Sequence, residues 1–69
     1  MAVARTKITE HDVVELRRDI GKWPAGTCGT ALIDHGRSKL VEISDDHGQE
    51  LDLFEVAEED LELVTAYPS

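Results

Sequence analysis

The tripeptide Asp-His-Gly occurs twice in this chain, at residues 34–36 and at residues 46–48. Histidine and aspartate are residue types of metal sites and of acid–base catalysis, so the repeat raises the question of a shared site. The segment between them alternates apolar and polar residues, as a β-strand does. At about 3.3 Å per residue, such a strand separates His35 from His47 by about 25–30 Å, too far for one shared site. We therefore interpret both tripeptides as turns, in which aspartate starts the reversal, glycine supplies a positive φ and histidine lies at the exposed tip.

The other residues that could take part in catalysis or metal binding are isolated or lack the spacing that such a site needs. Cys28 is the only cysteine, which excludes an internal disulfide and an all-cysteine zinc site. We expect it to be a small buried hydrophobic residue, because it has no neighbouring histidine in the sequence and no nucleophile elbow. The acidic segment at 45–50 lacks the spacing of a calcium loop, and the glycines at 26 and 29 open a strand instead of preceding a helix. We predict no catalytic residue, no metal and no cofactor, and hence no enzyme.

Charge is distributed unevenly along the chain. The formal net charge is −8, yet all seven Lys and Arg residues lie in residues 1–39, whereas residues 40–69 hold ten acidic residues and no basic one. An acidic half of this size repels phosphate backbones and favours a basic protein partner. The alternative is a solvated face that keeps a small protein soluble.

The elements expected to carry these residues are short strands. Apolar stretches recur between turn signals about 8–12 residues apart, which predicts a small all-β barrel or sandwich. We expect strands near 28–33, 39–45, 50–56 and 61–65, with Val41 and Ile43 on one face and a turn of 3₁₀ helix near 58–60. Gly26 and Gly29 predict a bent entry into the first of these strands, where a Cβ atom would meet neighbouring backbone.

Residues 9–21 fit two structures equally well. As a helix at about 10–20, the segment has Thr9 as N-cap, Asp12 three residues later and Gly21 as a stop, and the fold becomes α+β with a three- or four-stranded meander. As a strand, it has adjacent valines and the alternating pair Val14 and Leu16.

The segments "DVVELRRDI", "PAGTCGTALID", "KLVEISDDHGQELDLFEV" and "EEDLELV" together resemble a family of small bacterial proteins of unknown function. These proteins are taken to be SH3-like barrels, with a strand layout similar to that of KOW-type modules and of a small photosystem I stromal subunit. The resemblance implies a five-stranded barrel, a first strand at 12–18 and a long loop at 19–27 that carries Trp23. Residues that match the shared motifs are Gly26, Gly29, Thr30, Val41 and Glu42, whereas Cys28, Ala31 and the acidic second half depart from them. The family offers no catalytic residues to carry over.

These observations predict a single domain at residues 10–65, with a flexible arm at 1–9 and a tail at 66–69. No apolar run is long enough to span a membrane, and we expect a cytoplasmic protein. The predicted function is a non-enzymatic interaction module that binds or neutralises a basic protein, such as a toxin. Trp23 is expected either to cap the core or to anchor the interface. The candidate partner-binding residues are Trp23, Glu50, Asp52, Glu55, Glu58, Glu59 and Asp60.

Two other functions stay open at this point. One is nucleic-acid binding through a basic set made of Arg17, Arg18, Lys22, Arg37 and Lys39, as in KOW-type modules. The other is a structural role through a homodimer that pairs at an edge strand.

Overall fold

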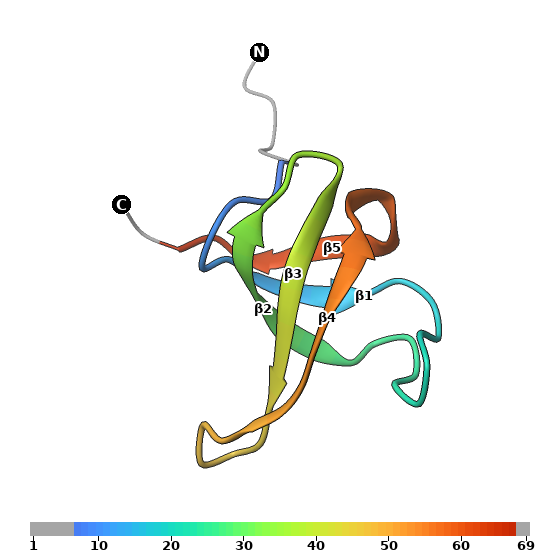
Figure 1. Cartoon of the computed structure of the whole chain (residues 1–69), viewed down its shortest axis with the longest axis vertical. Coiled ribbons are helices and arrows are strands. Elements are labelled where there is room, and N and C mark those ends of the chain that lie inside the picture. The colour runs from blue at the N-terminus through green and yellow to red at the C-terminus, as the bar shows by residue number, and fades with distance from the viewer. Residues whose placement is uncertain (1–6, 68–69) are drawn as a thin grey trace.

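Five antiparallel strands form one sheet in the computed structural model, which describes residues 7–67 (Figure 1). The order across the sheet is β4-β3-β2-β1-β5, and a 3₁₀ turn, η1, links the last two strands of the chain. The predictions of an all-β domain and of a 3₁₀ turn are both confirmed. The bounds are β1 Val13–Leu16, β2 Cys28–Asp34, β3 Ser38–Ser44, β4 Glu50–Ala57, η1 Glu58–Asp60 and β5 Leu61–Thr65.

The ambiguous N-terminal segment forms a strand, so the alternative with a helix at 10–20 is wrong. Val14 and Leu16 alternate inward and are 0 % and 1 % exposed, and β1 pairs with β2 on one side and with β5 on the other. The capping signal is nevertheless used locally, because Asp12 Oδ2 accepts hydrogen bonds from Thr9 N at 2.8 Å and from Thr9 Oγ1 at 3.2 Å. These bonds close a turn instead of a helix, since pairing on both edges outweighs the local preference.

The sheet bends because glycine and three irregularities interrupt its ladders. Register shifts occur between Val13 and Val14, in β2 before Ile33, and at the end of β3. In Figure 1, β1 and β5 therefore cross β3 and β4 at a steep angle, with β2 curving from one pair to the other. The expected closed barrel does not form: among residues 7–67 no ladder joins β4 to β5, and both are edges of the sheet.

The core lies in the concavity of this bent sheet, and both ends of the described chain contact it. Ile8 is fully buried, although it precedes the predicted domain boundary. Tyr67, in the predicted tail, donates its N–H to buried Asp12 at 2.8 Å. The rest of the predicted arm, residues 1–6, and of the tail, residues 68–69, lie outside the described residues. The buried apolar residues are Ile8, Val14, Leu16, Ala31, Val41, Ile43, Val56 and Leu61.

The two Asp-His-Gly tripeptides are turns at opposite ends of β3, as predicted. Gly36 and Gly48 have φ values of +86° and +83°, and both histidines are exposed. The turns are not equivalent, however. In the first, Asp34 of the tripeptide accepts the N–H two residues on, whereas in the second the preceding residue, Asp45, accepts the His47 N–H at 2.8 Å.

Candidate functional site

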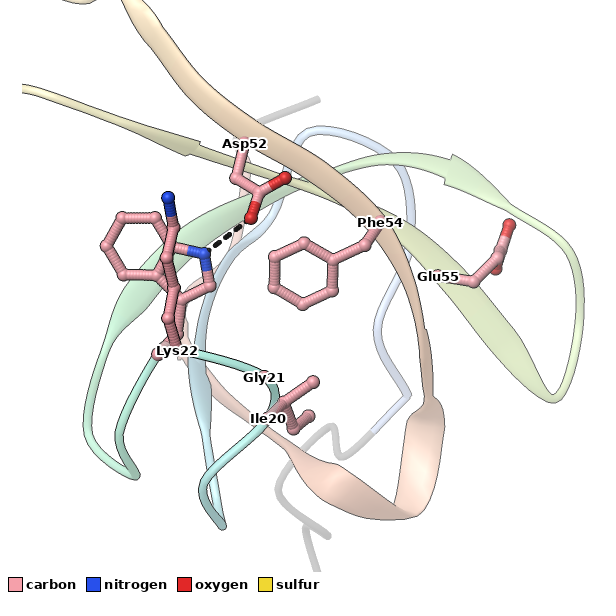
Figure 2. A pocket seen from close by; sticks show the side chains of 7 residues that line it. Ile20, Gly21, Lys22, Asp52, Phe54 and Glu55 are labelled. Atoms are coloured by element: carbon pink, nitrogen blue, oxygen red, sulfur yellow. Dashed lines mark hydrogen bonds between the residues drawn. The ribbon is translucent and has the colours of Figure 1, made fainter.

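A pocket of about 310 Å³ lies between the β1–β2 loop and β4 (Figure 2). Figure 2 shows Ile20 and Phe54 extending toward each other across it, and Glu55 pointing away from Phe54 at the border. We call this the Trp23 pocket. It is lined by Ile20, Gly21, Lys22, Trp23, Asp52, Phe54 and Glu55.

The loop side of the pocket is held in shape by hydrogen bonds within the loop. Ile20 and Trp23 exchange backbone hydrogen bonds of 2.8 and 2.9 Å, and Gly21 between them adopts a φ of +57°. Asp19 Oδ1 accepts the Ala25 N–H at 2.8 Å. The indole is therefore presented by an ordered turn, which lowers the entropy cost of using it in binding.

Asp52 on β4 fixes the position of the indole. Its Oδ2 accepts a hydrogen bond from Trp23 Nε1 at 2.7 Å, drawn as the dashed line in Figure 2, and its Oδ1 accepts the Leu53 N–H at 2.9 Å. The bond from Trp23 is the main reason that the pKa of Asp52 lies below its usual value, with the Leu53 N–H and the nearby Lys22 charge adding to it. Asp52 is thus an anion at neutral pH.

Lys22, itself a lining residue of the pocket, places its cation against the indole ring. Its Nζ lies 5.2 Å from the centroid of the Trp23 ring, within the range of a cation–π contact. The indole and the Asp52 carboxylate together form a surface on which a positive charge is stabilised.

The structure brings together three of the predicted partner-binding residues, namely Trp23, Asp52 and Glu55. Trp23 is half-buried against the core and also lines the pocket, so the two expectations for it do not exclude each other. Glu50 lies exposed at the start of β4, and Glu59 is exposed on η1.

Glu55 also makes an internal contact, with its Oε1 2.5 Å from His35 Nδ1. The other two predicted residues, Glu58 and Asp60, serve internal contacts as well. Glu58 Oε2 lies 3.1 Å from Lys39 Nζ and accepts the Ile8 N–H at 3.4 Å. Asp60 pairs with Arg18 at 3.0 Å. Glu58 thus holds η1 against β3, and Asp60 holds it against the start of the β1–β2 loop.

Lys39 is the clearest departure from the sequence interpretation. Its side chain is 0 % exposed, and its Nζ donates to Asp34 Oδ1 at 2.8 Å, to Glu58 and to the Gly36 carbonyl. Burial by itself lowers the pKa of Lys39, but the bonds to the two carboxylates outweigh burial and raise it. The same contact lowers the pKa of Asp34. A buried ammonium cannot contact phosphate, which removes Lys39 from the predicted basic set.

A signal for this burial was present in the sequence. Lys39 lies two residues before Val41, so it shares the buried face of β3. By the same alternation, Asp52 shares a face with Phe54 and Val56 on β4.

The structure also bears on the predictions for the single cysteine, for metal binding and for membrane spans. Cys28 is exposed, contrary to the expectation of a buried thiol, because it begins β2 at the edge of the packed region. Within residues 7–67 no three His, Cys, Asp or Glu side chains gather in a way that could hold a metal ion. Over the same residues, no helix has the length and apolar character needed to cross a bilayer.

Comparisons with protein-family models, with curated proteins and with solved structures found no match to this chain.

Proposed function

We propose that this protein is a non-enzymatic accessory module that binds a basic segment of a partner protein at the Trp23 pocket. The observation that carries the proposal is the pairing of an ordered indole with the ionised Asp52 carboxylate in an exposed pocket. Tryptophan presented on a rigid turn is a common interface anchor. Guanidinium groups bind both aromatic faces and carboxylates, so an arginine fits this chemistry best.

The charge of the whole chain supports the same partner class. A net charge of −8 accelerates the approach of a basic protein and repels nucleic acid. A basic toxin that this protein neutralises is one partner of this kind. We also propose that the chain is related to the bacterial SH3-like modules and that it acts in the cytoplasm. The long β1–β2 loop that carries Trp23 supports that resemblance.

The test uses Trp23 as a reporter, because it is the only tryptophan. Its fluorescence is titrated at 0.15 M salt with an octapeptide that alternates arginine and valine, and with a matched peptide that alternates glutamate and valine. We expect saturable binding of the basic peptide alone. Asp52→Asn keeps the size of the side chain and an oxygen that can accept the Trp23 Nε1–H, but it removes the anion. It should weaken binding by at least about tenfold, because a hydrogen bond to a charged group contributes about 1.5–3 kcal/mol.

The matched control is Glu62→Gln, which removes one exposed carboxylate on β5, away from the pocket residues. It should leave the affinity within about twofold, as expected for a screened surface charge. Equal losses in the two variants, or no saturable binding, would refute the pocket as the site.

A further inference from the structure

Among residues 7–67, no strand pairs with the outer edge of β4, the strand next to the pocket. β4 is the last strand of the sheet on its side, and it is eight residues long, whereas the other edge strand, β5, has five. In an antiparallel edge strand, alternate backbone N–H and C=O groups face away from the neighbouring strand and can pair with another chain. The Leu53 N–H is held by Asp52 Oδ1 in an exposed hydrogen bond, so a side chain of the same strand occupies this donor.

The two faces of β4 differ in chemistry. One face carries Leu51 and Leu53, which are 49 % and 40 % exposed, large values for leucines in a sheet. The other carries Asp52 and Phe54, which line the Trp23 pocket. An added strand would place successive side chains alternately on these two faces.

We infer that a partner segment adds to the sheet as a sixth strand along β4, with basic residues directed to the Trp23 pocket and aliphatic residues directed to Leu51 and Leu53. This inference rests on the proposed function and specifies its partner as an extended segment of alternating basic and aliphatic residues. When the added strand takes the Leu53 N–H, Asp52 Oδ1 is released and becomes available to a partner guanidinium. Main-chain pairing then supplies affinity, and the two faces supply specificity.

A basic partner fits this edge better than a second copy of the chain. Two β4 strands paired with each other would bring Glu50, Asp52 and Glu55 of each copy close to the same residues of the other. Like charges that face each other across strands are destabilising, and no basic residue of β4 offsets them. A strand that carries arginine at every second position reverses the sign of this interaction.

The first experiment compares two octapeptides of equal composition, one alternating arginine and valine and the other with four arginines followed by four valines. We expect the alternating peptide to bind at least tenfold more tightly. Leu51→Thr should weaken its binding several-fold, because it removes an aliphatic contact while keeping a good strand former. Val64→Thr on β5 is the matched control, since Val64 is also 49 % exposed, and it should change nothing.

The second experiment measures amide hydrogen exchange by NMR with the alternating peptide bound. The Leu53 amide should exchange at least tenfold more slowly, because its hydrogen bond moves from an exposed side chain into a ladder. The His47 amide is the control, since it too donates to an aspartate Oδ1, at 2.8 Å, but lies in the β3–β4 turn, and it should keep its rate.

The outcomes separate the two proposals. Tight binding of both peptides with no change at Leu53 would overturn strand addition and leave the pocket proposal standing. No binding of either peptide would overturn both. A peptide-free dimer in sedimentation that L51T dissociates would show that a second copy, not a basic segment, occupies this edge.

Discussion

The close approach of β3 to Gly29 on β2 can be tested by adding a single methyl group. A Cβ atom added at Gly29 would lie 2.8 Å from the Glu42 carbonyl oxygen, 2.9 Å from Val41 Cγ1 and 2.9 Å from Ile43 Cδ1. Gly29 pairs with Val14 across the β1–β2 ladder, so β2 cannot shift away from β3 without disturbing that pairing. Gly29→Ala therefore forces the sheet to open or the core to repack.

The loss of stability caused by Gly29→Ala depends on how far the atoms around the added Cβ can move. Overpacking a closed core costs about 1–3 kcal/mol, and the upper end applies because one contact is to backbone and the other two are to buried side chains. Replacing glycine by alanine returns about 0.4–1 kcal/mol by restricting the unfolded chain. The net loss should be about 2 kcal/mol. That loss is large beside the total of about 3–10 kcal/mol expected for this length, and it should lower Tm by about 8–16 °C.

The assay is urea unfolding followed by Trp23 fluorescence. Gly48→Ala serves as the control, because its added Cβ meets nothing within 4 Å and only the φ of +83° is unfavourable. That strain alone should cost about 1–2 kcal/mol, without the change in β2–β3 contacts that Gly29→Ala must show in NMR shifts. A Gly29→Ala protein as stable as the parent, with unchanged shifts at Val41, would refute the close-approach argument.

Three further predictions concern the buried ion pairs and the exposed thiol. Lys39→Met should lower the free energy of unfolding by about 2–4 kcal/mol, because Asp34 and Glu58 lose their cation. The exposed control Glu59→Gln should cost less than about 0.5 kcal/mol, and an equally small loss in Lys39→Met would contradict a stabilising role of these ion pairs. The folded-state pKa of Asp34 lies below its usual 3.8, so its stabilising contribution is complete above that pH and is lost as the pH falls through the lowered pKa. Between pH 5 and pH 2, the free energy of unfolding in urea should therefore fall less in Asp34→Asn than in the parent. The same fall in both proteins would contradict the contribution of Asp34. The pKa of Lys39 is raised above its usual 10.5, so its contribution to stability is complete below pH 10.5 and is lost as the pH rises through the raised pKa. Cys28 should react with Ellman's reagent in the native protein at a rate within about tenfold of the urea-unfolded protein, and strong protection would show that the thiol is buried after all.

Much of the fold was predictable because its signals are local. Alternation placed Val41 and Ile43 on the buried face of β3, and the positions of Gly36 and Gly48 marked both ends of that strand. Three of the residues singled out from the acidic second half and the single loop tryptophan, Trp23, Asp52 and Glu55, line the Trp23 pocket, and their role in binding stays a prediction. The pocket residues Ile20 and Phe54 were missed, because an apolar residue gives the same pattern whether it lines a pocket or fills a core.

Local patterns in the sequence were enough to place β2 to β5 and the glycine turns at both ends of β3, because side-chain alternation and glycine conformations act over a few residues. The tertiary structure was needed to establish that residues 13–16 form a strand, since pairing with β2 and β5 settles a choice that local preference leaves open. It also decided that Lys39 is enclosed by Asp34 and Glu58, and that Trp23 meets Asp52, 29 residues away. Such contacts join residues far apart in the chain, so they form only once the folded sheet brings β3, β4, η1 and the β1–β2 loop together.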